Sequence, residues 1–207
     1  MAMNAEPWFP SVIWNADVKG IDNQALKDYA INHAQIDKGR VISNYGGYQS
    51  NDVKSGQNAV LDQLVQHINE AVNEIAESVG LHPVTLYNVW ININPPGAYN
   101  HTHHRQDAVF SGVYYIDAQE GQGNINFMRN DGAEYHLPST LIKQPHHFNS
   151  SKTTYPAKTG ALYIFPGWLH HSVDGNTLSE NRISISFNIM ITGRAGKDKD
   201  LCGITWK

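Results

Sequence analysis

Alternation of polar and apolar side chains is the clearest pattern in this chain, and it is strongest over residues 182–191, RISISFNIMI. A period of two residues is typical of a β-strand that buries one face. The apolar side holds Ile183, Ile185 and Phe187, whereas the polar side begins with Arg182. A buried guanidinium needs an anionic partner, because an unpaired charge is costly to bury. Either a structural Asp or Glu of the chain or a bound anion would meet that need.

A second alternating segment runs over residues 88–94, NVWININ. Its polar side carries Trp90, Asn92 and Asn94. Successive asparagines make this side too polar for a dry core, so we expect it to face a ligand cavity or water. Pro95 then ends the strand, because proline cannot donate a hydrogen bond to a sheet.

Further strands are expected where short apolar runs lie between turn residues. These runs are residues 7–14, which their prolines place at a sheet edge, and residues 108–116, 124–128 and 160–166. Residues 129–153 are polar and irregular, and they predict a flap or a long loop.

Two helices are predicted ahead of most of these strands. Residues 57–79 carry one broad apolar stripe at helical spacing, and Gly80 is a natural stop. Residues 22–35 have the same spacing over a shorter stretch. Between the two helices, the SNYGGYQSND segment at residues 43–52 is typical of turns and could line a pocket mouth.

Helices followed by many short strands favour a mainly β chain with flanking helices, in the α+β class. The expected core is an antiparallel double-stranded β-helix, also called a jelly roll or cupin-like fold, with the N-terminal helices packed outside. We expect one domain over residues 1–207. Its helical support should span about 22–80 and its jelly-roll core about 84–192.

Composition narrows the expected partners and compartment. The chain has 207 residues, with 15 Lys+Arg against 19 Asp+Glu and no long basic stretch, so duplex nucleic acid is not an expected partner. Cys202 is the only cysteine, which excludes an internal disulfide and fits a reducing compartment. The first residues lack a signal-peptide pattern, and no apolar run approaches the roughly 20 residues that span a bilayer. We expect a cytoplasmic protein without a membrane partner.

Histidine is the unusual residue, with 11 copies, several of them clustered. His101 and His103 are two residues apart, and in an extended strand that spacing puts two side chains on one side. With His171 from a distant strand end, three imidazoles would meet one ion and leave other positions open. Open positions with such ligands are the pattern of a non-haem Fe(II) oxygenase. Asp107 is the reserve ligand and His104 a weaker one; the alternative is that these histidines are polar surface residues.

Several motifs resemble the 2-oxoglutarate- and Fe(II)-dependent dioxygenases, in particular a branch common in bacteria and phages. The motifs cover most of the chain and include SNYGGYQS at 43–50, WININ at 90–94, SGVYY at 111–115 and GALYIFPGWLHHSV at 160–173. The most specific item is the spacing His171-x10-Arg182-x-Ser184.

The resemblance implies roles for residues on several strands. His171 would be the distal metal ligand, Arg182 would bind the distal carboxylate of 2-oxoglutarate, and Ser184 would add a hydrogen bond. The other co-substrate-binding positions implied are Asn92, Asn94, Tyr115 and Ser111. The family usually carries His-x-Asp or His-x-Glu as its proximal pair, whereas this chain has His101-Thr102-His103. We therefore expect a three-histidine metal site, in which the catalytic residues are His101, His103, His171 and Arg182.

The implied activity is that of a hydroxylase which uses Fe(II), 2-oxoglutarate and O2 on an unidentified substrate and releases succinate and CO2. Substrate selection would fall to Tyr48, Gln49, Trp90, Arg105 and the 129–153 segment. The resemblance also admits a homodimer, and a phage-encoded protein would work in the host cytoplasm.

Two other functions remain open from the sequence. A three-histidine cupin-type dioxygenase or isomerase would not use 2-oxoglutarate, and its Arg182 would bind the substrate's own carboxylate. A metal-free jelly-roll module would serve in binding or structure. Anaerobic addition of Fe(II) and 2-oxoglutarate separates these functions.

Overall fold

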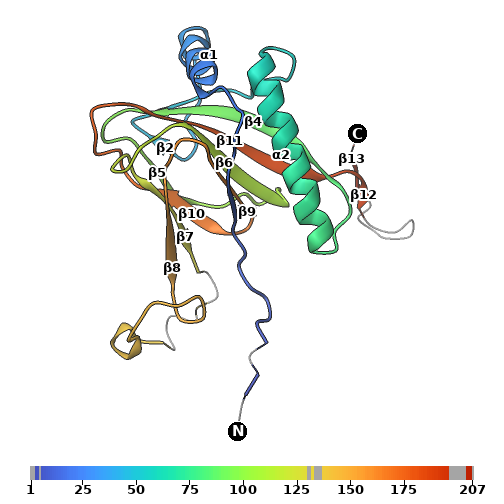
Figure 1. Cartoon of the computed structure of the whole chain (residues 1–207), viewed down its shortest axis with the longest axis vertical. Helices are drawn as coiled ribbons and strands as arrows, with labels where there is room; N and C mark the ends of the chain where they lie inside the picture. Colours follow the sequence, from blue (N-terminus) through green and yellow to red (C-terminus); the bar gives the residue numbers. More distant parts are fainter. Residues whose placement is uncertain (1–2, 5, 130–131, 133–136, 196–203, 207) are drawn as a thin grey trace.

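Two antiparallel sheets form the body of the protein, and two helices lie against the larger sheet (Figure 1). The computed structural model describes residues 3–4, 6–129, 132, 137–195 and 204–206. Cys202 lies outside this described part of the chain. Neither of the described α-helices combines the length and the apolarity that a membrane span requires.

The large sheet is built around its two longest strands, which pair antiparallel at its centre. Its order is β1 (Trp14–Asp17), β9 (Ala161–Pro166), β6 (Phe110–Asp117), β11 (Arg182–Ile191), β4 (Val84–Asn94) and β3 (Tyr48–Gln49). The small sheet has the order β2 (Asn44–Tyr45), β5 (Tyr99–His103), β10 (His170–Val173), β7 (Asn124–Met128) and β8 (Lys152–Pro156). A separate hairpin of β12 (Gly193–Ala195) and β13 (Ile204–Trp206) follows the body.

Both helices begin at a capped end. The side chain of Asn58 accepts hydrogen bonds from the backbone N–H groups of Val60 and Leu61 at the start of α2 (Ala59–Ser78). Asp22 caps α1 (Asn23–Ile36) in the same way.

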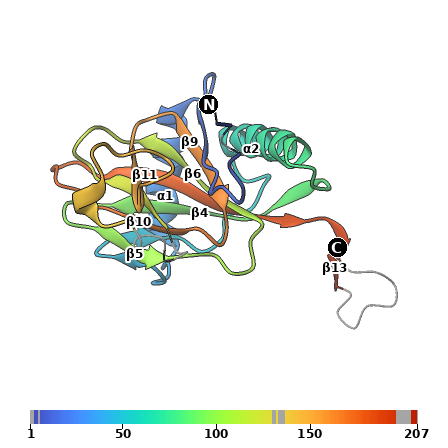
Figure 2. The ribbon, with the colours of Figure 1, turned by 90° about the horizontal axis from the view of Figure 1, so that it is seen from below.

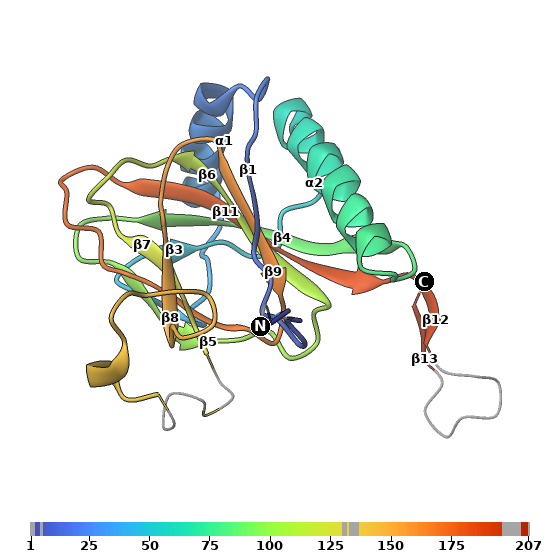
Figure 3. The same ribbon diagram turned by 60° about the horizontal axis from the view of Figure 1, so that its bottom comes forward.

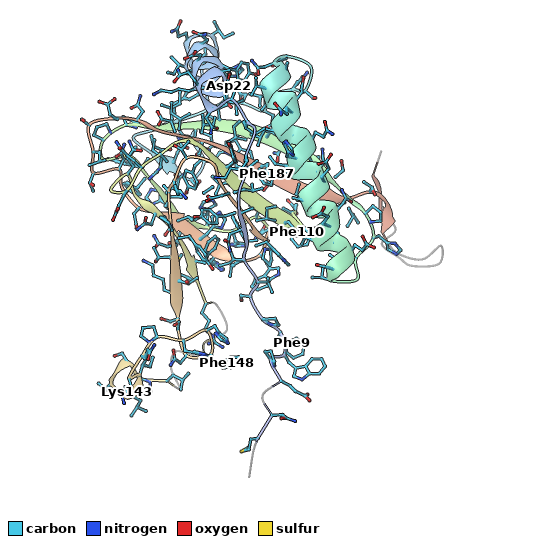
Figure 4. All side chains as sticks on the ribbon, in the orientation of Figure 1. Phe9, Asp22, Phe110, Lys143, Phe148 and Phe187 are labelled. Atoms are coloured by element: carbon cyan, nitrogen blue, oxygen red, sulfur yellow. The ribbon has the colours of Figure 1, made fainter. Side chains whose placement is uncertain are left out.

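One face of the large sheet is covered by the helices. The stripe of α2 that includes Leu64 and Ile68 is fully buried and belongs to one core with Ile185 and Phe187 of β11. Figure 4 shows Phe187 beneath α2, and Figure 2 shows α2 on the side of the large sheet away from β5 and β10. The opposite face of the large sheet is therefore turned toward the small sheet.

The connection between β7 and β8 projects away from the body (Figure 3). It contains a short 3-10 helix, η2 (Ser139–Leu141), and its labelled side chains Lys143 and Phe148 lie beyond the ends of β7 and β8 (Figure 4). The long loop predicted for residues 129–153 is confirmed for its described residues, and β8 takes over from Lys152. Residues 130–131 and 133–136 lie outside the described part.

Most predicted elements are confirmed, including the jelly-roll core with helices outside. The strand predicted over residues 7–14 is wrong in position, because β1 begins only at Trp14; Trp8 and Phe9 are exposed. It is nevertheless an edge strand, as its prolines indicated. The turn segment 43–52 contains β2 and β3, which join the two sheets at one end.

Candidate active site

A cavity lies between the inner faces of the two sheets, with about 530 Å³ of empty space including its mouth. Its polar lining comes from the large sheet as Asn92, Asn94, Ser111, Tyr115, Arg182 and Ser184, and from the small sheet and its flank as Asn100, His103, Arg105 and His171. None of its described lining residues is an Asp or a Glu. The prediction that the polar sides of β4 and β11 face a cavity is confirmed.

The ladders of the large sheet place these polar side chains in rows. Ser184 on β11 lies opposite Asn92 on β4 and opposite Tyr115 on β6. Arg182 lies opposite Asn94. Because facing residues of neighbouring strands point to the same side of a sheet, all five side chains converge on the cavity.

Arg182 is 1% exposed, yet its partners are not acids. Its Nη1 donates hydrogen bonds to the backbone carbonyls of Gln122 and Asp174. No carboxylate of a described residue forms an ion pair with it; the Asp174 side chain accepts a hydrogen bond from Asn126 instead. Burial lowers the pKa of Arg182, and the nearby Tyr115 and Asp174 oppose that shift. The internal acid that sequence reasoning left open is not found among the described residues.

Two further groups of the cavity are buried without a hydrogen-bond partner: the Tyr115 hydroxyl and the Asn94 Nδ2. Burial raises the pKa of Tyr115 to about 12, so its hydroxyl keeps its proton at neutral pH. Buried polar groups are nearly always paired in folded proteins. Two unpaired groups that can donate, next to a guanidinium, therefore fit an anionic ligand such as a carboxylate.

Asn92 and Ser111 face the same cavity but already have partners. The Asn92 amide donates to the Ser186 hydroxyl at 2.9 Å, and the Ser111 hydroxyl donates to the Asn188 side chain at 2.8 Å. Their predicted co-substrate contacts stay predictions.

His103 and His171 are cross-strand partners on β5 and β10, and their ring centroids are 4.2 Å apart. The Nδ1 of His103 lies 2.7 Å from the carbonyl of His101, and the Nδ1 of His171 lies 2.9 Å from that of Leu169. A carbonyl can only accept, so each Nδ1 carries the proton and each Nε2 has a free lone pair. The Nε2 of His103 is buried without a partner. Metal-binding histidines are commonly oriented in this way, with one ring N–H donated to a carbonyl and the other nitrogen left to coordinate the metal.

Both imidazoles are held neutral. Burial, and to a smaller degree the Arg105 cation, lower the pKa of His103 to about 4. Burial against Phe165 and Phe127, together with the His103 ring, lowers the pKa of His171 to about 3. Neutral imidazole is the form that coordinates metals, so the described cavity offers two suitable nitrogen ligands.

The expectation that His101 and His103 share one side of an extended strand is wrong. His103 faces His171, but Asn100 faces Val173, so two residues of β5 lie opposite one residue of β10. This is a β-bulge, which shifts the alternation of side chains by one position. As a result Asn100 and His103 both line the cavity, whereas the exposed His101 ring packs edge-on against Tyr99 at 4.9 Å.

The other proposed ligands also lie outside the cavity lining. Asp107 is exposed, and the ring of His104 lies 4.6 Å from that of His170, on the side opposite His103 and His171. Within the described residues, no group of three His, Cys, Asp or Glu side chains is placed to hold a metal ion. The convergence of three imidazoles is thus corrected to a convergence of two.

Comparisons with known proteins indicate the family that this chain resembles. The family model described as "Putative 2OG-Fe(II) oxygenase" matches residues 88–188, which contain every cavity residue discussed above. Residues 88–188 therefore belong to the 2-oxoglutarate- and Fe(II)-dependent oxygenase family. No curated protein matches this sequence.

Solved structures share the fold of this chain at low identity. A Pseudomonas putida prolyl-4-hydroxylase is 17% identical with a TM-score of 0.65, and the match covers 88% of this chain and 94% of that one. The alpha-ketoglutarate-dependent epimerase SnoN from nogalamycin biosynthesis is 13% identical with a TM-score of 0.64, over 92% and 81%. The viral collagen prolyl hydroxylase of Paramecium bursaria Chlorella virus-1 is 17% identical with a TM-score of 0.58, over 86% and 94%.

The four residues predicted to select substrate divide into two groups. Trp90 and Arg105, both predicted to select substrate, line the cavity. Tyr48 and Gln49 do not belong to its lining: Tyr48 donates its hydroxyl to Asp37 at 2.9 Å, and Gln49 is buried where β3 pairs with β4. Asn100 is a cavity residue that sequence reasoning did not single out. Its place in the cavity follows from the bulge between β5 and β10, which residue spacing alone does not reveal.

Proposed function

We propose that this oxygenase binds Fe(II) and 2-oxoglutarate in the cavity and hydroxylates a primary substrate, with release of succinate and CO2. One observation carries the proposal. A single cavity combines two neutral imidazoles, the buried His171 and the half-buried His103, with a buried arginine that meets no described carboxylate. The two imidazoles can bind a metal ion, and the arginine can bind a dicarboxylic acid. A 2-oxoglutarate-dependent oxygenase needs both.

His103 and His171 are the proposed metal ligands, through Nε2. Their Nδ1 contacts to backbone carbonyls fix the ring orientation, so the rings need not reorganise when the ion binds. Bound Fe(II) supplies the oxygen activation that no side chain of the cavity performs. His101, and Asp107 in reserve, would join the ligand set only after a rearrangement of the bulged β5.

Arg182 is the proposed partner of the distal carboxylate of 2-oxoglutarate. Two backbone carbonyls hold its Nη1 and leave Nε and Nη2 without a hydrogen bond to a described residue. The unpaired Tyr115 hydroxyl and Asn94 amide are the added donors, and Ser184 lies between Arg182 and Tyr115 on the same face. Phe165, Ile125 and Val173 form the apolar part of the lining, which excludes water from the ligands.

Hydroxylation is proposed because two of the similar structures named above carry hydroxylase titles. The epimerase title of SnoN marks the main alternative outcome on the same scaffold. Incorporation of one labelled atom from 18O2 into the product, with one succinate per turnover, supports hydroxylation. Turnover without labelled product contradicts it.

The binding step is tested by anaerobic titration of the protein with Fe(II) and then with 2-oxoglutarate. The proposal expects a visible charge-transfer band that requires both additions and disappears on addition of a chelator. Iron binding without the band would favour a cupin-type enzyme that does not use 2-oxoglutarate. No iron binding would favour a metal-free binding module.

A further inference from the structure

We propose that the primary substrate carries an anionic group, a carboxylate or a phosphate, and that this group binds Arg105 over the face of Trp90. The inference rests on the proposed function, since it names the class of substrate that the same cavity takes. Three features of the cavity carry it: an unpartnered guanidinium, an aromatic platform and a one-sided charge.

Arg105 is fixed in position by its backbone but not by its side chain. Its backbone N–H donates to the carbonyl of Gly167 at 2.7 Å, and its side chain lines the cavity two residues after His103. The guanidinium forms no hydrogen bond and no ion pair with a described residue. An arginine presents planar N–H donors that match a carboxylate or a phosphate. A half-buried arginine that meets no acid of the described residues can therefore bind an anion in this cavity.

The indole ring of Trp90 forms a flat aromatic surface beside Arg105. The ring is 4% exposed, and the Cζ of Arg105 lies 5.0 Å from its centroid, within cation–π range. A second cation, Arg40, lies 5.8 Å from the same ring. Arg40 is already neutralised, because its Nη2 pairs with Asp52 at 2.5 Å. Of the two guanidiniums near Trp90, Arg105 is thus the one that pairs with no acid in the described part of the chain.

The charge of the cavity also favours an anionic substrate. Its described lining holds Arg105 and Arg182 and no Asp or Glu, although the chain as a whole carries a net charge of −4. A cavity lined by one sign of charge attracts ligands of the other sign. One 2-oxoglutarate has a single distal carboxylate, and Arg182 is its proposed partner. Arg105 remains for a second anion, next to the proposed metal ligand His103.

The test uses three small probes that share a benzene ring: benzoate, benzamide and phenyl phosphate. Each is titrated by calorimetry into protein loaded with Mn(II) and saturating 2-oxoglutarate, so that Arg182 is occupied. We expect at least one of the two anions to bind about tenfold or more tightly than benzamide, as a charge-assisted hydrogen bond allows. A preference for benzoate identifies a carboxylate substrate, and a preference for phenyl phosphate identifies a phosphate ester.

Variants assign the preference to one side chain. Arg105→Gln should abolish the discrimination between the anions and benzamide, and Arg105→Lys should keep part of it. Lys19→Gln removes the same charge beyond β1, at the opposite edge of the large sheet from β4, and should bind the probes as the native protein does. Circular dichroism and thermal unfolding confirm that each variant is folded.

The inference is overturned if native protein does not distinguish the anions from benzamide, or if Arg105→Gln still does. The charge-transfer band of the native protein is measured in parallel. A band without Arg105-dependent anion binding would defeat the inference and leave the proposed function intact. Arg105-dependent anion binding without a band would leave the anion site standing and defeat the proposed function.

Discussion

Asn94 lies directly opposite Arg182 in the ladder between β4 and β11, and its side-chain Nδ2 is buried with no hydrogen-bond partner. The two residues therefore present unused donors side by side on one face of the sheet. Donors left unpaired in a protein interior cost about 1–3 kcal/mol each. Their persistence here is explained most simply by a ligand that accepts from both.

Replacement of Arg182 should separate co-substrate binding from metal binding. We expect Arg182→Ala to weaken 2-oxoglutarate binding by about 30-fold or more, the cost of removing one partner of a buried charge pair. Metal affinity should stay near that of the native protein, because the two imidazoles are untouched. Arg182→Lys is the matched variant and should recover part of the loss. Titration of the charge-transfer band measures 2-oxoglutarate affinity, and competition with a metal-chelating dye measures metal affinity; unchanged 2-oxoglutarate affinity in Arg182→Ala would refute the assigned role.

The two cavity histidines should behave differently from their neighbour outside it. His103→Ala and His171→Ala each remove one of the two imidazoles, so we expect each to lose metal binding by at least about tenfold. His101→Ala should bind metal nearly as well as the native protein, since its ring packs on Tyr99 outside the cavity. Competition with a metal-chelating dye measures the affinities. A loss of metal binding in His101→Ala would restore the three-histidine site that the sequence predicted.

Because Gly123 has no side chain, it leaves room for the guanidinium of Arg182. A Cβ at this position would collide with the Arg182 Nη1 and with the carbonyl of Asp174, and the residue has a φ of +91°. Gly123→Ala should therefore displace the guanidinium, weaken 2-oxoglutarate binding and destabilise the fold. Gly20→Ala is the control, because Gly20 has a similar φ of +80° with no atom within 4 Å. It should lose only the roughly 1 kcal/mol expected from backbone strain, and calorimetric unfolding with 2-oxoglutarate titration compares the two.

Asp37 should give the fold a dependence on acid pH. Hydrogen bonds from Asn51, Tyr48 and Gly39 lower the pKa of Asp37 to about 2 from its usual 3.8. A carboxyl whose pKa is lower in the folded state contributes stability above the unfolded pKa and loses it as pH falls through the folded value. Native protein should therefore lose stability between about pH 4 and pH 2.

The matching variant is Asp37→Asn, which cannot ionise. It should be less stable than native protein at pH 7 and should lose less stability between pH 4 and pH 2. Thermal unfolding across this range measures both slopes. Parallel slopes in the two proteins would show that Asp37 makes no such contribution.

Local periodicity was sufficient for the elements whose burial is uniform along their length. The stripe of α2 and the alternation of β11 each predict which face is buried, because those patterns depend on residues within the element itself. The polar face of β4 was correctly predicted to meet a cavity for the same reason. The strand predicted over residues 7–14 was wrong in position because an apolar composition indicates burial. Trp8 and Phe9 are nevertheless exposed.

The metal set was harder to predict because it depends on the partner strand. The two-residue spacing of His101 and His103 specifies one side only in an unbroken strand, and the bulge opposite β10 adds a residue that changes the side. The hydrogen-bond partners of Arg182 could not be predicted from the sequence for a related reason. Its nearest acceptors are backbone carbonyls, one of them at Gln122, sixty positions away, and no side-chain pattern encodes them.

Because carbonyl oxygens rather than an acid hold Arg182, the folded protein keeps a full positive charge in its interior until a ligand arrives. A ligand that binds only the native state raises stability in proportion to the logarithm of its concentration. The midpoint of thermal unfolding should therefore rise with the concentration of any dicarboxylic acid that pairs with Arg182.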